Sequence, residues 1–253
     1  MICSLAPFAQ AGAESLVEAS GWGKYFEEGQ TQGTFVLYDL GRDQWKVFNK
    51  TRAETRFIPA STFKIPHALI ALDTNTVKDP RQVFAWDGVT REITEWNKAQ
   101  TLRTAMKYSV VPVFQGFARD IGPERMMDFL EKFQYGNMDV SGVIERFWLD
   151  GDKLAISAIE QVNFLVKLFK DELPVSRESQ WIVKDILVSE ATKKYVLRSK
   201  TGMASKIGWW VGWVETDDDV YFFACNIDLL QERNIGDRIN VSRKILEAEN
   251  ILL

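Results

Sequence analysis

A hydroxyl and an amine stand three positions apart in this chain, as Ser61 and Lys64. Three residues are close to one turn of a helix, so both side chains would lie on the same helix face. The flanking residues are apolar, and apolar surroundings lower the pKa of a lysine because the ammonium ion is poorly solvated there. A neutral lysine can act as a base or react with carbon dioxide. The pair therefore predicts a serine nucleophile that is activated by lysine chemistry.

Ser-x-x-Lys is a common pattern, and the isolated motif is most simply explained as a helix N-cap serine followed by a solvated lysine. Two later motifs change this interpretation, because Ser109-Val110-Val111 follows a helical pattern and Lys200-Thr201-Gly202 follows a strand pattern. Three such motifs in this order resemble the penicillin-recognising serine enzymes. The middle motif, Ser-x-Val, is similar to that of the class D β-lactamases, the oxacillinase family.

Other segments extend this resemblance from about residue 20 to the C-terminus. They are Tyr135-Gly136-Asn137, the run Phe147-Trp148-Leu149-Asp150-Gly151 and the tryptophan-rich run from Lys206 to Glu215. The resemblance implies hydrolysis of the β-lactam amide bond through a serine acyl-enzyme. It also implies that β-lactam antibiotics are the partners and that resistance to them is the outcome.

The resemblance assigns a modified side chain to Lys64, which would add carbon dioxide and become an N-carboxylated lysine; no other cofactor is implied. This carbamate would take the proton of Ser61 during acylation and later activate the water that cleaves the acyl-enzyme. A buried carbamate needs hydrogen-bond donors, and the indole N–H of Trp148 would supply one. By the same resemblance, Val111 packs over the carbamate and Leu149 is an apolar neighbour of the deacylating water. From sequence spacing alone, packing in the hydrophobic core explains Trp148 as well as a role in binding the carbamate does.

Two further segments would complete the acyl-transfer site. The resemblance implies that Ser109 relays a proton to the departing lactam nitrogen, with the positive charge of Lys200 beside it; a capping serine in a turn is the alternative. Gly202 would permit a close backbone approach. The N–H of Met203 would form an oxyanion hole together with that of Ser61.

A β-lactam carries a carboxylate, so we expect a cationic clamp for it. The resemblance places this clamp at Arg238, near the start of the last helix, and Thr201 could add a hydroxyl to the same carboxylate. Arg243 is the alternative clamp. The mechanism needs no proton transfer from the segment Tyr135-Gly136-Asn137. We expect this segment to form a turn that shapes the cleft wall.

Two other kinds of protein share Ser-x-x-Lys and Lys-Thr-Gly. One is a β-lactam sensor domain, which is acylated and stays acylated; the other is a small penicillin-binding transpeptidase or carboxypeptidase. Sensor domains come attached to membrane segments, and no apolar run in this chain reaches the ~18 residues that a membrane helix needs. The Ser-Val-Val motif and Trp148 favour the β-lactamase over the penicillin-binding protein.

Composition excludes several other functions. The net charge of −4 argues against nucleic-acid binding, which needs a basic face. One histidine and two cysteines cannot make a zinc cluster. That histidine, His67, is six residues from Ser61, or about 240° around a helix, so a Ser-His-Asp hydrolase is disfavoured. The sequence leaves the oligomeric state open, a homodimer included.

The first residues, 1–11, resemble the end of a secretory signal, because Ala9-Gln10-Ala11 fits the small-x-small cleavage pattern. We therefore expect a truncated signal remnant and secretion to the periplasm; a disordered, mildly apolar terminus is the alternative. Cys225 lies in an apolar strand pattern and is expected to pack as a small hydrophobe. A disulfide between Cys3 and Cys225 is disfavoured if the terminus is trimmed.

The pattern of apolar residues predicts an α+β protein with one domain over residues 12–253. A sheet lobe, from about 12–56 and 190–253, would join both ends of the chain in one antiparallel sheet flanked by terminal helices. A helical lobe would occupy about 57–189, with the site in the cleft between the lobes, as in the penicillin-recognising fold. The expected helices are 14–27, 66–73, 101–108, 112–120, 123–133, 157–170, 176–187 (with Trp181 in the core) and 236–249, and the expected strands are 33–38, 44–48, 195–200, 207–215 and 220–227.

One departure from the family concerns the substrate. Only four residues, Met203 to Lys206, stand between Lys200-Thr201-Gly202 and Ile207, whereas many relatives have a longer loop there. A shorter loop would open the cleft beside the side group of the substrate. We therefore expect a preference for bulkier β-lactams, and hydrolysis of carbapenems is in doubt.

Overall fold

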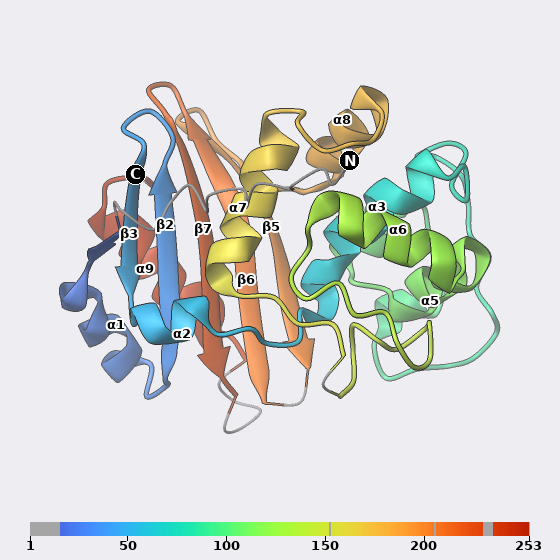
Figure 1. Cartoon of the computed structure of the whole chain (residues 1–253), viewed down its shortest axis with the longest axis horizontal. Helices are drawn as coiled ribbons and strands as arrows, with labels where there is room; N and C mark the ends of the chain where they lie inside the picture. The colour runs from blue at the N-terminus through green and yellow to red at the C-terminus, as the bar shows by residue number, and fades with distance from the viewer. Residues whose placement is uncertain (1–15, 152, 205, 230–234, 253) are drawn as a thin grey trace, which may run out of the picture.

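The computed structural model describes residues 16–151, 153–204, 206–229 and 235–252; the predicted signal remnant and Cys3 lie outside these ranges. One seven-stranded sheet carries helices on both faces, and further helices form a group beside it (Figure 1). This arrangement confirms the predicted α+β fold.

The sheet joins the two ends of the chain, because β2 from the N-terminal part pairs with β7 from the C-terminal part. All neighbouring strands are antiparallel except β1 and β3, which run parallel. In spatial order the strands are β1 (Leu16–Glu18), β3 (Gln44–Phe48), β2 (Gly33–Asp39), β7 (Val220–Asp228), β6 (Ile207–Thr216), β5 (Tyr195–Ala204) and β4 (Val188–Ala191).

Most of the helices lie between β3 and β4 in the chain. Within the described ranges, none is long and apolar enough to cross a membrane. The helices are α1 (Gly23–Glu28), α2 (Lys50–Glu54), α3 (Lys64–Asp73), α4 (Leu102–Lys107), α5 (Val111–Ile121), α6 (Pro123–Phe133), α7 (Ala158–Phe169), α8 (Arg177–Ile186) and α9 (Asp237–Ala248), and 3₁₀ turns occur at Ser20–Trp22, Ala60–Phe63 and Thr94–Trp96.

Strand β7 shows why this sheet needs cover on both faces. Phe222 and Ala224 belong to the larger apolar core, which continues into the group of helices. Phe223 and Cys225 point the other way, into a smaller core closed by α1 and α9. Side chains alternate along a strand, so an apolar run of this length buries both sets. Cys225 is buried, as predicted for a small hydrophobe, and no disulfide joins it to another described residue.

Helix α7 covers the face of the sheet formed by β2, β6 and β7 (Figure 1). It begins with a capping box, in which Ser157 Oγ accepts from the Glu160 N–H and the Glu160 carboxylate accepts from the Ser157 N–H. The sequence places this segment in the helical lobe, but its apolar stripe packs on the sheet. A stripe shows which face is buried and not which element buries it.

One prediction about secondary structure and one about burial were wrong. The helix expected over 14–27 is replaced, from residue 16 on, by the short strand β1, a 3₁₀ turn and the six-residue helix α1. Trp181 was expected in the core, but it is 68 % exposed. Helix α8 buries Ile182, Val183 and Ile186 instead, and the tryptophan lies outside that face. The short elements α2 and β4 were not expected.

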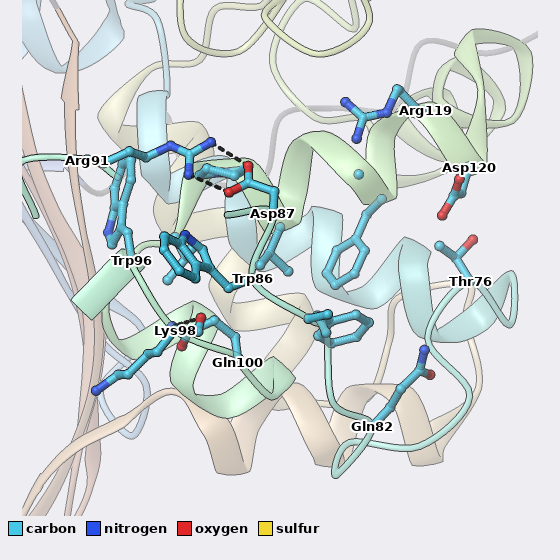
Figure 2. Close-up of a pocket in the computed structure, with 17 residues that line it drawn as sticks. Thr76, Gln82, Trp86, Asp87, Arg91, Trp96, Lys98, Gln100, Arg119 and Asp120 are labelled. Carbon is cyan, nitrogen blue, oxygen red and sulfur yellow. Dashed lines mark hydrogen bonds and ion pairs between the residues drawn. The ribbon is translucent and has the colours of Figure 1, made fainter. Parts of the chain in front are cut away.

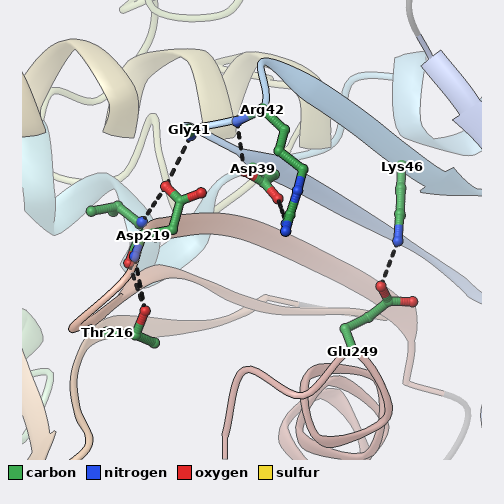
Figure 3. A network of polar contacts seen from close by, with 8 residues as sticks. Asp39, Gly41, Arg42, Lys46, Thr216, Asp219 and Glu249 are labelled. Atoms are coloured by element: carbon green, nitrogen blue, oxygen red, sulfur yellow. Dashed lines mark hydrogen bonds and ion pairs between the residues drawn. The ribbon is translucent and has the colours of Figure 1, made fainter.

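A polar network ties the turns of the sheet together and reaches the last helix (Figure 3). The backbone N–H of Gly41 in the β2–β3 turn donates to Asp219 in the β6–β7 turn at 2.9 Å. Farther along, Lys46 of β3 pairs with Glu249 at 2.6 Å, directly after α9. These contacts join the β2–β3 turn to the β6–β7 turn, and β3 to the residue that follows α9.

Candidate active site

The turn before α3 brings Ser61 and Lys64 together. The 3₁₀ turn Ala60–Phe63 runs directly into α3, and Lys64 Nζ lies 2.9 Å from Ser61 Oγ. Ala60, the residue before the serine, has φ +49°, a left-handed conformation that costs an alanine about 1 kcal/mol. Such backbone strain is concentrated at functional sites. Here it sets the sharp turn that presents the serine.

The side chain of Lys64 is completely buried. Burial holds the pKa of its ammonium well below the usual range, and the charge of Lys200 lowers this pKa further. Its Nζ lies over the ring of Phe114, 5.2 Å from the ring centroid. Burial therefore favours the neutral form of the amine next to Ser61, which is the form that can accept a proton.

Trp148 lies in the same apolar compartment, fully buried. Its ring centroid is 5.7 Å from that of Phe63 and 5.1 Å from that of His67. Its indole Nε1 is buried and has no hydrogen-bond acceptor among the described residues. A buried donor without an acceptor costs about 1–3 kcal/mol. The residues therefore fit a carboxylated lysine, which would bring acceptor oxygens into this compartment.

Ser109 ends helix α4 and faces Lys200 on the sheet. Its φ is +57°, and the N–H groups of Ser109 and Val110 donate to the carbonyls of Met106 and Ala105. This is the Schellman arrangement, in which glycine usually occupies the left-handed position. A serine there keeps the turn and adds a hydroxyl. That hydroxyl oxygen accepts from Lys200 Nζ at 2.9 Å.

Lys200 is buried on β5, where its Nζ also donates to the carbonyl of Thr201 at 2.9 Å. Burial, and after it the positive charge of Arg238, lowers the pKa of Lys200 to about 7. Near neutral pH this lysine therefore holds its proton loosely, as a proton relay requires.

Gly202 brings β5 against the nucleophile turn. A Cβ at this position would lie 2.9 Å from the carbonyl oxygen of Pro59 and 3.2 Å from the backbone nitrogen of Thr62. A strand with a larger residue could not approach the turn so closely. Met203, the next residue, is half exposed at the mouth of the site.

Arg238 and Arg243 both lie on α9, but their surroundings differ. Arg238 is 9 % exposed, its Nε has no partner within the described residues, and its charge acts on Lys200. Arg243 is held by Glu190 through an ion pair at 2.8 Å. The geometry therefore favours Arg238 as the cation that faces the site.

Three other predicted site residues surround this centre. Val111 is the first residue of α5, two positions after Ser109, and is partly buried. Thr201 is partly buried beside Lys200. Leu149 is partly buried beside Trp148 and lines a cavity of about 710 Å³, together with Ala204 and Lys206 at the end of the β5–β6 hairpin and Arg56, Phe57, Ile58, Asp150, Gly151, Leu154, Ala155 and Ile207.

The segment Tyr135-Gly136-Asn137 supports the loop that carries Trp148. Asn137 Nδ2 donates to the carbonyl of Lys153 at 2.7 Å, and its Oδ1 accepts from the Ala155 N–H at 2.8 Å. Gly136 has φ +57°, and a Cβ there would collide with the carbonyl of Ala155. The expected turn is present, but its described hydrogen bonds go to Lys153 and Ala155, which follow Trp148 in the loop. In the sequence, a glycine between two residues that can hydrogen-bond indicates a turn of this kind.

A second cavity, of about 290 Å³, lies between the segment 76–100 and α5 (Figure 2). Aromatic side chains line it, among them Trp86 and Trp96, and an ion pair between Arg91 and Asp87 lies at its edge. Ser61, Lys64 and Ser109 do not line it, so it is separate from the centre described above. Throughout the described ranges, no group of His, Cys, Asp and Glu could hold a metal ion.

Comparisons with known proteins agree with this geometry. Residues 25–247 match the penicillin binding protein transpeptidase domain. The chain is 49 % identical over 246 residues to beta-lactamase OXA-48 of Klebsiella pneumoniae, covering 96 % of this chain and 92 % of that protein. It is 43 % identical over 259 residues to beta-lactamase OXA-10 of Pseudomonas aeruginosa, covering 100 % of this chain and 96 % of that protein.

A solved structure extends the comparison to the fold. The class D beta-lactamase YbXI from Nostoc superposes with a TM-score of 0.89 at 38 % identity, over 91 % of this chain and 99 % of that one. Full-length similarity at this level, together with a buried lysine beside Ser61, identifies the chain as a serine hydrolase that belongs to the class D β-lactamases.

Proposed function

We propose that this protein hydrolyses the amide bond of β-lactam antibiotics through an acyl-enzyme on Ser61, and so confers resistance to them. The observation that carries this proposal is the 2.9 Å contact between Ser61 Oγ and the Nζ of Lys64, a lysine that is completely buried. A lysine at that distance places a base beside the hydroxyl, where it can take the proton as the serine attacks the lactam carbonyl. The class D relatives support the same reaction.

Breaking the lactam bond requires a proton on the departing nitrogen, and Ser109 is the residue to supply it. Lys200 Nζ donates to Ser109 Oγ, so the hydroxyl proton of the serine is directed away from the lysine. After the transfer, Lys200 can return a proton to Ser109, because its pKa of about 7 allows it to give one up near neutral pH. The backbone N–H groups of Ser61 and Met203 would bind the oxyanion.

Hydrolysis of the acyl-enzyme needs a base, and we assign this role to a carboxylated Lys64. A neutral lysine amine and carbon dioxide give a carbamate and one proton, and the carbamate would supply a general base for the attack of Ser61 and for the deacylating water. Lys64 is suited to this reaction because burial keeps its amine neutral. Trp148 would hold the added oxygens through its unpartnered indole N–H, and Val111 would exclude water from them.

Arg238 and Thr201 would bind the substrate carboxylate, and the cavity beside Leu149 would take the acyl side chain. That cavity, of about 710 Å³, reaches Ala204 and Lys206, at the short β5–β6 connection. Its size favours bulky β-lactams over carbapenems. Turnover of a penicillin, a cephalosporin with a bulky side chain and a carbapenem tests this preference; a carbapenem as the best substrate would contradict it.

Mixing the protein with a large excess of benzylpenicillin and following the lactam absorbance tests the reaction itself. We expect many turnovers per protein. A single stoichiometric burst would instead indicate a sensor domain or a penicillin-binding protein, which are acylated without turnover.

Secretion to the periplasm also stays a prediction, because residues 1–11 lie outside the described ranges. Fractionation of cells that express the protein tests it.

A further inference from the structure

His67 is a buried polar residue that the mechanism above does not use. It lies on α3 and is completely inaccessible to solvent. Neither ring nitrogen, Nδ1 or Nε2, has a hydrogen-bond partner among the described residues. A neutral imidazole has one N–H donor and one acceptor nitrogen. Leaving both without partners in an apolar core is costly, so the position calls for an explanation beyond packing.

The ring of His67 lies in the compartment that holds Lys64. It packs edge-on to Trp148, with centroids 5.1 Å apart and an interplanar angle of 76°. Its centroid is 5.5 Å from that of Phe114, the same ring that lies 5.2 Å from Lys64 Nζ. His67 is also three residues after Lys64 on one helix, close to a full turn. The histidine therefore contacts Trp148 directly and shares Phe114 as a neighbour with Lys64.

Unsatisfied polar atoms are concentrated here. Seven buried side-chain nitrogen and oxygen atoms lack partners within the part of the chain that the structure describes, and three of them are His67 Nδ1, His67 Nε2 and Trp148 Nε1. These three atoms belong to two side chains, and each side chain offers one donor, the indole N–H and one imidazole N–H. A pair of unused donors in an apolar compartment matches an anion with two acceptor oxygens.

We propose that His67 is a positioning residue whose neutral imidazole N–H donates, with Trp148 Nε1, to the carboxylate of a carboxylated Lys64. This inference rests on the proposed function, since it needs carbon dioxide on that lysine. The imidazole stays neutral mainly because its burial in apolar surroundings lowers the pKa of His67, to about 3. It therefore supplies a donor without adding a charge to the site.

Nuclear magnetic resonance tests this directly, because the chain contains one histidine. In untagged protein labelled with ¹⁵N-histidine, all imidazole signals belong to His67. We expect the imidazole N–H proton signal to move downfield when bicarbonate is added to protein freed of carbon dioxide. Imidazole signals that stay unchanged while ¹³C-bicarbonate produces a carbamate signal would overturn the inference. Absence of any carbamate signal would overturn the proposed role of Lys64 instead.

Two variants separate hydrogen bonding from packing. His67→Phe keeps an aromatic ring and removes both nitrogens, whereas His67→Asn keeps an N–H donor near the position of Nδ1. We expect the bicarbonate concentration for half-maximal ¹³C-carbamate signal to rise roughly tenfold or more in His67→Phe, the effect of one lost hydrogen bond to a charged group. His67→Asn should recover most of this loss, and KM for benzylpenicillin at saturating bicarbonate should be unchanged in both.

Phe117→Leu is the matched packing control. Its ring contacts His67 at a centroid distance of 6.2 Å and offers no polar group. We expect this variant to melt at a lower temperature and to keep the wild-type bicarbonate dependence. A folded His67→Phe variant with the wild-type bicarbonate dependence would refute the inference. If that variant does not fold, the imidazole signals of the wild-type protein decide.

Discussion

Lys200 Nζ and Ser109 Oγ lie 2.9 Å apart, although the two residues are 91 positions apart in the sequence. One residue sits within a sheet strand and the other in a left-handed position at the end of a helix. The contact therefore joins the two lobes at the site. It also makes the backbone geometry of Ser109 a functional feature, because a strained turn directs its hydroxyl to the lysine.

Two substitutions of Ser109 should distinguish the effect of its left-handed backbone on stability from the effect of its hydroxyl on activity. We expect Ser109→Ala to keep the left-handed strain and lose the hydroxyl, with kcat/KM for benzylpenicillin falling about 100-fold, typical of a lost proton relay. Ser109→Gly should lose the same activity but gain about 1 kcal/mol in free energy of unfolding relative to Ser109→Ala. Steady-state kinetics and urea unfolding measure the two effects. Equal stability of the two variants would count against the strain.

Lys200 should make stability depend on pH in a defined window. Its pKa is about 7 in the folded protein and about 10.4 in an unfolded chain. Between these values the unfolded state binds more protons, so the contribution of Lys200 to the free energy of unfolding rises with pH. Below about pH 7 both states are protonated and the cost of the buried ammonium is largest.

Lys200→Met removes that cost together with the activity. We expect this variant to exceed the wild type in free energy of unfolding at pH 6, and the difference to shrink as the pH rises toward about 10.4. Urea unfolding at several pH values measures it. Lys194→Met, at an exposed position, is the control and should show no such trend. A difference that grows with pH would show that the assigned pKa shift has the wrong direction.

Two tryptophans offer a matched comparison of function and stability. Trp148→Phe keeps the ring packing and removes an indole N–H that has no described partner, so we expect little change in melting temperature. Its acyl-enzyme should live about 100-fold longer, seen by mass spectrometry of the intact protein. Trp209→Phe removes a 2.8 Å hydrogen bond to the carbonyl of Ile58. It should instead lose about 1–3 kcal/mol of stability. The reverse pattern would place the functional indole at Trp209.

Local spacing was enough to predict part of this site. Ser61 and Lys64 stand one turn apart, and this relation depends only on helix geometry. The long-range contact between Ser109 and Lys200 followed from the family resemblance and from no local pattern. The sequence could not show the left-handed backbone at Ala60, because alanine rarely adopts it and only the surrounding fold imposes it.

Other misses have similar causes. Trp181 is a large apolar residue, but the buried stripe of α8 passes through Ile182 and Val183, so residue type alone was misleading. Strand β1 has three residues, too few to show an alternating pattern. It is extended because it pairs with β3, which the local sequence does not show. The environment of His67 depends on rings from three separate segments, so its unpartnered nitrogens became visible only in the folded chain.

Gly202 should tolerate no side chain. A Cβ there would lie 2.9 Å from the Pro59 carbonyl, so Gly202→Ala must move β5 or the nucleophile turn. We expect kcat/KM to fall by roughly 100-fold, because small displacements of reacting groups are costly. Gly116→Ala is the control, since the nearest atom to its Cβ would be 3.8 Å away. Wild-type kinetics in Gly202→Ala would show that the close approach is not needed.

The central claim is that Lys64 drives both formation and hydrolysis of an ester on Ser61. Its most direct test is intact-protein mass spectrometry of Lys64→Ala mixed with excess benzylpenicillin, read over time beside the wild type. We predict that the variant slowly gains one acyl group per molecule and keeps it, whereas the wild type returns to its unmodified mass as the penicillin is consumed. A Lys64→Ala variant that clears the acyl group as fast as the wild type would contradict the account.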